Sequence, residues 1–210
     1  MSSESCGGKI VEIYRLATMR YKGDIGLWFK YLEFCRQKRN GRMKKVLAQV
    51  IRFHPKEAGV WIYAAAWDFD RNLNVAAARA LMQNGLRVCS NSEDLWVEYL
   101  IMELTYLNKL KVHEKEENDD SIVEDVEDAS EKVDVFREKG FNVLQAIYGG
   151  AIEALRSSFD LRKHFLEILE APDLAHSDEM RNTILSDLKR DFSKDPEYWK
   201  WLARHEMRQA

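Results

Sequence analysis

The chain has 210 residues, and its 32 basic side chains against 35 acidic ones give a net charge of −3. Hydrophobic residues make up 46% of the sequence and prolines number only three, a composition typical of a well-buried helical protein and not of a disordered one. The sequence contains no run of 18 apolar residues and no apolar signal-peptide core near its start, so we expect no membrane partner.

Regularly spaced aromatic residues are the first sign of organisation. In "GDIGLWFKYLEF" (residues 23–34), Trp28 and Tyr31 lie three apart, on one face of a helix. The pattern returns at Trp61 in "VWIYAAAW", and at Trp96 with Tyr99 in "LWVEYLIM". The three tryptophans are 33 and then 35 residues apart, and a period of about 34 is typical of two-helix repeats. We therefore predict an all-α fold, an α-solenoid of stacked antiparallel helix pairs with these aromatics in the repeat core.

A second helix follows each of the first two aromatic segments. "MKKVLAQVIRFHP" (residues 43–55) has apolar residues at helical spacing and ends at Pro55, which cannot continue a helix. "AAARALMQNGLRV" (residues 76–88) repeats this pattern about one period later. The sequence thus predicts an alternation of a Trp-led helix and an amphipathic partner.

Further copies are expected near the end of the chain. "DPEYWKWLARHE" contains Trp199, which lies 103 residues after Trp96, or about three periods. "FDLRKHFLEILEA" (residues 159–171) fits the Trp-led helix between them, although it contains no tryptophan. We expect Trp199, like the earlier tryptophans, to lie in a repeat core.

A strongly acidic segment interrupts the repeats. Residues 113–134 contain eleven acids and two lysines, a net charge of −9, so the rest of the chain carries +6. Such a charged, apolar-poor run is predicted to be a disordered insertion between the helices of the third repeat. The expected organisation is a flexible N-terminus (1–13), repeats 1 to 3 (first part) (14–110), the acidic disordered insertion (111–134), and continuing repeats that end mid-repeat (135–210).

Basic residues concentrate at the turn between the first two predicted helices. In "RQKRNGRMKK" six of ten residues are cationic: Arg36, Lys38, Arg39, Arg42, Lys44 and Lys45. These residues are candidates for contact with a polyanion or another partner, or for a nuclear-import signal, and the structural alternative is a solvated turn. Because the run has no aromatic residue on which a base could stack, we expect any RNA contact to involve the backbone only.

The sequence offers little for catalysis. Its five histidines form no HExxH motif or i,i+4 pair, and no Cys-x-x-Cys motif is present, so we expect no metal site and no cofactor. Gly149 and Gly150 are a lone glycine pair, not a phosphate-binding loop, and they either permit close helix packing or break a helix. We predict neither enzymatic activity nor a small-molecule substrate.

The repeat unit departs from ordinary tetratricopeptide repeats, which have Leu-Gly at the third and fourth places after Trp. Here those places are Tyr-Leu, Ala-Ala and Tyr-Leu. Trp at the start of the first helix, an aromatic residue three on, "AAR" in the second helix and Pro55 after it resemble the HAT (half-a-TPR) repeat family. Its known carriers are scaffolds of RNA-processing complexes. The segments "YKGDIGLWFKYLEFCRQ" and "NVAAARALMQNGLRVCSNSEDLWVEYLIMEL" resemble the nucleolar members that belong to the small-subunit processome.

This resemblance implies a non-catalytic scaffold in the nucleus and nucleolus. Its expected partners are other processome proteins and the particle of U3 small nucleolar RNA (snoRNA) and pre-rRNA, contacted directly or through other proteins. The expected role is support of pre-rRNA processing and of 18S rRNA and small-subunit maturation. Two alternatives remain open: a HAT-repeat scaffold of a splicing or RNA 3′-end processing complex, and a TPR-like adaptor that binds peptides.

Overall fold

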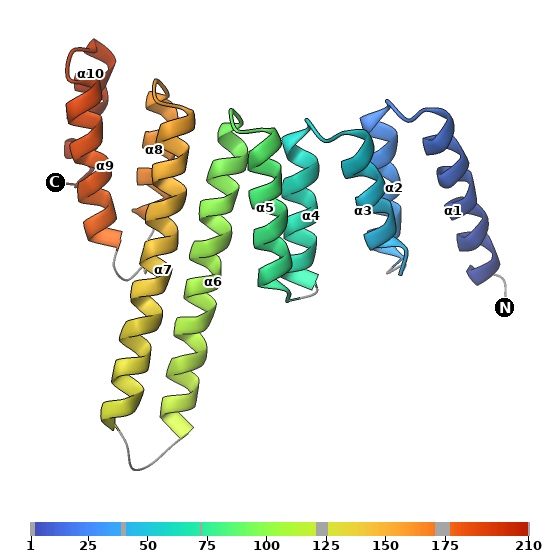
Figure 1. The fold of residues 1–210 in the computed structure, drawn as a ribbon, viewed down its shortest axis with the longest axis horizontal. Helices are drawn as coiled ribbons and strands as arrows, with labels where there is room; N and C mark the ends of the chain where they lie inside the picture. Colours follow the sequence, from blue (N-terminus) through green and yellow to red (C-terminus); the bar gives the residue numbers. More distant parts are fainter. Residues whose placement is uncertain (1–2, 39–40, 72, 121–125, 171–176, 210) are drawn as a thin grey trace. The chain divides into compact units, whose positions relative to one another are not determined.

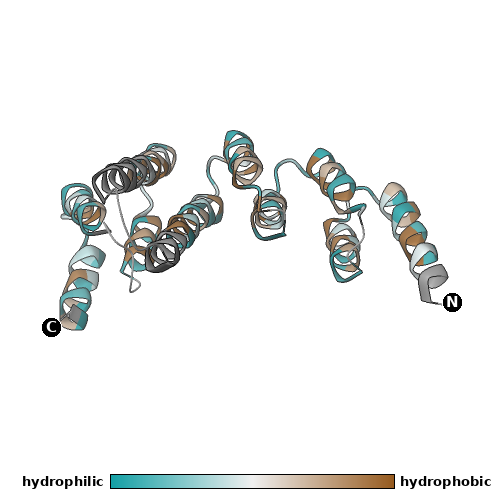
Figure 2. Cartoon of the chain, turned by 90° about the horizontal axis from the view of Figure 1, so that it is seen from below, coloured by the Kyte–Doolittle hydropathy of each residue, from teal (hydrophilic) through white to brown (hydrophobic). Residues whose placement is uncertain are grey.

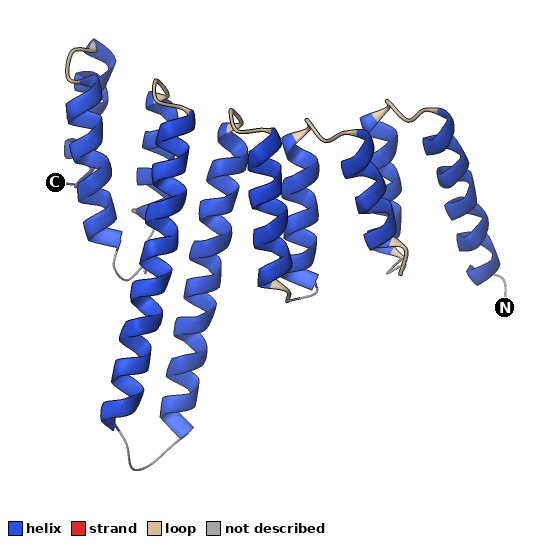
Figure 3. Ribbon diagram, in the orientation of Figure 1, coloured by secondary structure: helices blue, strands red, loops and turns tan. Residues whose placement is uncertain are grey.

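The structure, a computed structural model, describes residues 3–38, 41–71, 73–120, 126–170 and 177–209. These residues form helices and connecting turns without any strand, as the all-α prediction requires (Figure 3). None of the helices in the described part of the chain is long and apolar enough to cross a membrane. The chain divides into two compact units, residues 1–90 and residues 91–210, and each is described here by itself.

The described residues of the first unit form five helices, and each packs against the next in the chain with its direction reversed (Figure 1). Around these helices hydrophilic and hydrophobic residues alternate, as expected of amphipathic helices (Figure 2). The core contains both predicted aromatics of the first repeat, since Trp28 is 0% and Tyr31 2% exposed. The helices are α1 (Ser3–Arg20), α2 (Ile25–Gln37), α3 (Met43–Phe53), α4 (Ala58–Arg71) and α5 (Val75–Val88).

The predicted flexible N-terminus (1–13) differs from the structure, in which α1 begins at Ser3. Val11 is buried and belongs to the same hydrophobic cluster as Trp28. The ring of Tyr14 stacks on that of Tyr31, with centroids 5.4 Å apart. Because α1 buries these side chains on one face, it is held against α2 as an ordered helix.

A tryptophan-to-backbone hydrogen bond recurs at the start of the Trp-led helices. In α2 the indole Nε1 of Trp28 donates to the carbonyl of Lys22 at 2.9 Å. In α4 the indole of Trp61 donates to the carbonyl of Pro55 at 2.8 Å. Each carbonyl lies six residues before its tryptophan, in the turn that precedes the helix. The bond therefore satisfies a buried N–H group and fixes the angle at which the helix leaves the turn.

The same two carbonyls accept a second hydrogen bond from the residue that ends a later helix. His54, just after α3, donates from Nε2 to the carbonyl of Lys22 at 2.8 Å. Cys89, just after α5, donates from Sγ to the carbonyl of Pro55 at 3.6 Å. Each turn is thus bonded both to its own Trp-led helix and to the end of the following helix, one period further along the chain.

Five helices are also found among the residues of the second unit that the structure describes, and α6 and α7 are the longest of these (Figure 1). Within it α6 packs on α7 and α8, α8 on α9, and α9 on α10. Its core includes Tyr99, at 5% exposed. The helices are α6 (Glu93–Asp120), α7 (Val126–Ala154), α8 (Phe159–Leu169), α9 (Ser177–Phe192) and α10 (Pro196–Gln209).

The acidic insertion predicted to be disordered (111–134) is helical over most of its length. Residues 111–120 continue α6 and residues 126–134 begin α7, while 121–125 lie outside the described residues. The segment contains no glycine or proline, and six of its residues are Glu, which favours helix. The helical backbone therefore continues through residues whose composition alone indicated disorder.

Of the two interpretations of the glycine pair, close helix packing agrees with the structure, because α7 continues unbroken through both residues. A Cβ added at Gly150 would lie 2.8 Å from the ring of Trp96, whereas one at Gly149 would meet nothing within 4 Å. At Gly140, in the same helix, an added Cβ would collide with Leu107. Glycines on one side of α7 thus let it approach α6 closely.

Helix α8, which contains no tryptophan, has an arginine at the position that tryptophan occupies in α2. Arg162 lies four residues after the N-cap of α8, as Trp28 does after the N-cap of α2, and is 1% exposed. Its Nη2 donates at 3.3 Å to the carbonyl of Arg156, again six residues earlier. Its Nη1 lies 2.9 Å from Asp191, and its guanidinium lies 4.8 Å from the ring centroid of Phe192. Arg162 thus reproduces the tryptophan contact and adds an ion pair.

Trp199 departs from the expectation of a core position, since it is 53% exposed. Its indole still donates to the carbonyl of Ser193, six residues earlier, at 2.8 Å. Tyr198 is the buried residue at this point, at 3% exposed. Trp61 is 8% exposed and Trp96 is half-buried, so burial at the tryptophan position differs from one helix to the next.

Candidate partner-binding pocket

The predicted basic residues that the structure describes have different neighbours. Arg36 lies in the last turn of α2, where its guanidinium binds the carboxylate of Glu33 through two hydrogen bonds of 2.8 and 2.9 Å. Lys38 follows α2 and is exposed, and Arg39 lies outside the described residues. Arg36 is therefore largely engaged within its own helix.

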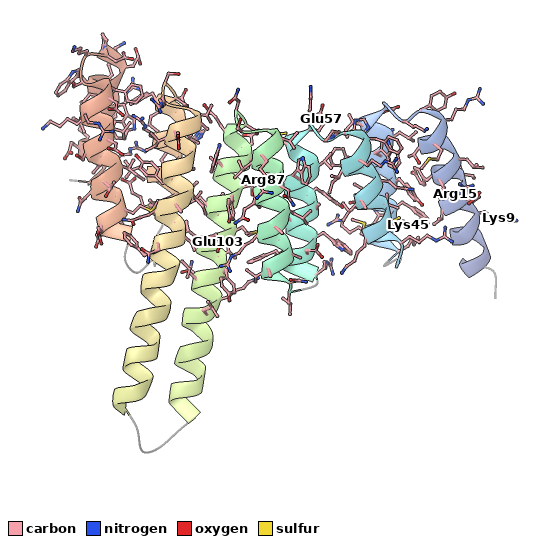
Figure 4. All side chains as sticks on the ribbon, viewed as in Figure 1. Lys9, Arg15, Lys45, Glu57, Arg87 and Glu103 are labelled. Carbon is pink, nitrogen blue, oxygen red and sulfur yellow. The ribbon has the colours of Figure 1, made fainter. Side chains whose placement is uncertain are left out.

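Lys44 and Lys45 are neighbours in the first turn of α3 but face different helices. The Nζ of Lys44 lies 3.9 Å from a carboxylate oxygen of Asp68 in α4. Lys45 instead lines a pocket whose wall includes residues of α1. Figure 4 labels Lys45 on α3 and Arg15 on α1. Adjacent positions on a helix point about 100° apart, so two successive lysines can reach different neighbours.

The pocket has a volume of about 410 Å³ and is bounded by three helices of the first unit. Its cations are Arg15 from α1 and Arg42 and Lys45 from the start of α3. The remaining lining is apolar or uncharged, with one residue each from α1 and α2 and two more from α3: Met19, Tyr31, Val46 and Gln49. The arrangement combines an apolar interior with positive charge, which suits a ligand that has both properties.

The pocket has one acidic neighbour whose interactions are resolved, Glu12. Glu12 receives two hydrogen bonds from Arg15, at 2.6 and 2.8 Å, and these bonds lower the pKa of its carboxyl group. The charge of Arg42 lowers that pKa further. Burial raises the pKa of Tyr31, so its hydroxyl stays neutral at physiological pH. Three cations against Glu12 leave this group of residues with a charge of +2.

The cations at the start of α3 do not stabilise that helix. Lys44 and Lys45 lie in its first turn, and Arg42 occupies the N-cap without a side-chain capping bond. Positive charge near a helix N-terminus opposes the helix macrodipole and costs roughly 0.3–1 kcal/mol per group. The positive charge at the start of α3 therefore lies at a place where it lowers the stability of the helix.

The pocket brings together groups that bind rather than react. It contains no cysteine, histidine or serine among its lining residues. Across the residues that the structure describes, no group of three or more His, Cys, Asp or Glu side chains could hold a metal ion. Guanidinium and ammonium groups around an apolar interior can attract and orient an anionic partner.

Of the six predicted basic residues, the structure brings Arg42 and Lys45 together in this pocket and directs Lys44 elsewhere. The sequence did not indicate Arg15 and Met19 as lining residues. Both belong to α1, and the first residues of this helix were predicted to be flexible. Their helical spacing of four residues is a weak signal that could have placed them on one face.

These features define a class of protein. It is all-helical, the same hydrogen bond from a side chain to a turn carbonyl recurs in several of its helices, and its first unit contains a basic pocket. No family model matches the chain. Similar curated proteins are the U3 small nucleolar RNA-associated protein 6 homologs of Homo sapiens, 26% identical over 200 residues, and Dictyostelium discoideum, 29% identical over 233 residues. The U3 small nucleolar RNA-associated protein 6 of Schizosaccharomyces pombe is 33% identical over 103 residues.

The matches cover a larger share of this chain than of the relatives. The human relative aligns with 95% of this chain, the Dictyostelium relative with 91% and the fission yeast relative with 49%. The chain spans only 32%, 38% and 21% of those proteins, or about a third of the length of the first two. The similarity thus extends over nearly all of this chain and over a minor part of its relatives.

Proposed function

We propose that the chain is a non-catalytic scaffold of the nucleolar U3 small nucleolar ribonucleoprotein within the small-subunit processome. In this role it supports pre-rRNA processing and the maturation of 18S rRNA and the small ribosomal subunit. It acts as an α-solenoid of HAT-type repeats that holds other processome proteins, and through them or directly the particle of U3 snoRNA and pre-rRNA.

The observation that carries this proposal is the match to relatives named for their association with U3 snoRNA, which extends over 95% of the chain in the human case. The recurring contact between the tryptophan position and a turn carbonyl supports the repeat architecture. It occurs at Trp28, Trp61, Arg162 and Trp199. Stacked repeats bury one another's apolar faces and leave an extended surface for partners.

The contribution of such a scaffold is positional. Helix pairs held by buried aromatics give a surface whose shape does not depend on a ligand, so partners that bind it are held at fixed separations. The basic pocket offers one such attachment point within the first unit. Protein contacts of this kind raise the local concentration of partners without any chemical step.

Recovery of bound RNA tests the proposal. The tagged chain is expressed in cells, recovered from nuclear extract at moderate salt, and its RNA is sequenced beside that of the tag alone. The expected result is enrichment of U3 snoRNA together with 18S precursor. Enrichment of spliceosomal RNA or of mRNA 3′-end processing factors would replace the proposed particle with another one, and recovery of protein partners without RNA would indicate a peptide adaptor.

A further inference from the structure

We propose that the pocket between α1, α2 and α3 is a docking site for a short acidic segment of a partner protein. An aliphatic or aromatic side chain of that segment enters the pocket, and flanking carboxylates contact Arg15, Arg42 and Lys45. This goes beyond the scaffold function, because it assigns a particular site and the chemistry of its ligand. It does not depend on which particle the protein joins.

The interior of the pocket suits an apolar anchor. Val46 and Tyr31 are each 2% exposed, so they form a floor that is fixed by the core behind it. Met19 adds an adaptable thioether side chain from α1. At about 410 Å³ the pocket lies within the range of roughly 300–1,000 Å³ typical of ligand sites, so it has room for one large side chain.

The positive groups are arranged around this interior and come from two helices. Arg15 belongs to α1, while Arg42 and Lys45 belong to the start of α3. The bidentate bond to Glu12 fixes the guanidinium of Arg15, so three cations and one neighbouring carboxylate surround the pocket. Carboxylates on either side of an anchor residue would complement charge on both sides of the pocket. The charge complementarity therefore indicates an acidic segment.

The pocket fits a peptide better than RNA. Binding of single strands without sequence preference relies on exposed aromatic faces and on cations that follow the backbone. Tyr31, the aromatic residue of this pocket, is almost fully buried, and Tyr14 stacks on its ring. The cations surround a single apolar pocket instead of following a line. The first unit thus offers a place for an anchor side chain rather than a platform for bases.

Adjacent lysines provide a matched pair of variants. Lys45→Gln removes a charge from the pocket, whereas Lys44→Gln removes the same charge from the next residue, which lies beside Asp68. Both substitutions remove a cation from the first turn of α3, so neither should weaken the helix. Thermal unfolding followed by circular dichroism checks that both variants are folded. Any difference in binding then reports the pocket and not the overall charge.

The probe is obtained without assuming its sequence. A phage-displayed library of random twelve-residue peptides is selected on the full chain, and the enriched peptides are synthesised with a fluorescent label. The expected peptides contain two or more Asp or Glu residues close to a Leu, Ile, Phe or Trp. By fluorescence anisotropy, Lys45→Gln should weaken binding by about threefold or more, while Lys44→Gln should leave it nearly unchanged.

Two further measurements complete the test. Met19→Gln keeps the charge of the pocket and should also weaken the peptide, because the anchor loses apolar contact. A labelled single-stranded RNA of the same length should bind more weakly than the peptide. Failure to enrich acidic peptides, equal losses from Lys44→Gln and Lys45→Gln, or an RNA that binds more tightly and is displaced by the peptide would each overturn the proposal. None of these results would alter the recovery of U3 snoRNA.

Discussion

At the scale of single residues, one contact recurs along the chain. The residue at the tryptophan position bonds to the carbonyl six residues earlier, and a tryptophan or an arginine can make this contact. The sequence shows the tryptophans but not their acceptors, because a backbone carbonyl has no signature in the residue type. It also conceals the copy at Arg162, whose role appears only in the bond to Arg156.

Burial at the tryptophan position predicts unequal costs of truncation. Trp61→Ala removes a side chain that is 8% exposed together with its bond to Pro55, and it should cost about 3–5 kcal/mol. Trp199→Ala, at 53% exposed, should cost only about 1 kcal/mol. Urea unfolding followed by circular dichroism measures both. Equal losses for the two variants would contradict the assigned positions.

The ion pair of Arg162 predicts a second effect. Asp191→Ala leaves the buried guanidinium without its 2.9 Å partner and should cost about 2–3 kcal/mol, less than a fully buried pair because Asp191 is 30% exposed. Asp160→Ala breaks an exposed pair with Lys163 and should cost less than about 1 kcal/mol. Urea unfolding of both variants beside the parent tests the comparison, and a larger loss from Asp160→Ala would contradict it.

The same pair predicts a pH dependence. The hydrogen bond from Arg190 and the charge of Arg162 hold the pKa of Asp191 below its ordinary value of 3.8. A lowered pKa in the folded state stabilises the protein above that ordinary value, and the contribution is lost as the pH falls through the lowered pKa. The stability difference between the parent and Asp191→Ala should therefore shrink in acid. An equal or growing difference at low pH would contradict the assignment.

At the scale of helices, α2 to α5 and α10 follow from sequence signals, because a tryptophan or an amphipathic stripe marks each of them. The sequence pattern does not reveal the start of α1, whose packing depends on contacts of Val11 and Tyr14 with residues of α2 and beyond. The sequence analysis also missed the lengths of α6 and α7, since acidic composition was taken to exclude order. An acidic composition indicates that a segment can bury little apolar surface. It does not exclude a helix, because each helix is held by hydrogen bonds within its own backbone.

Adjacent glycines in α7 predict opposite effects. Gly149→Ala should raise stability by about 0.5–1 kcal/mol, because alanine favours helix and its Cβ would meet nothing within 4 Å. At Gly150 the added Cβ would lie 2.8 Å from Trp96, and overpacking of about 1–3 kcal/mol should outweigh the gain. Thermal unfolding of the two variants tests the packing of α7 on α6. Stabilisation by both substitutions would contradict it.

At the scale of the whole molecule, the candidate site was only partly predictable. The basic run suggested a surface near residues 36–45, but charge alone does not tell which cations converge. Lys45 lines the pocket while Lys44 lies beside Asp68, and Arg15 arrives from a different helix. The function follows neither from the fold nor from the pocket, since many unrelated proteins share such folds. It rests on the relatives, of which this chain spans about a third.

Synthesis of ribosomal RNA in cells depleted of the protein tests the central proposal most directly. New rRNA is pulse-labelled after depletion, and the yields of 18S and large-subunit rRNA are compared with those of untreated cells. A scaffold of the U3 particle predicts a selective loss of 18S rRNA with accumulation of its precursors, while large-subunit rRNA continues to form. Normal 18S synthesis after depletion, or an equal decline of both rRNAs, would contradict the proposal.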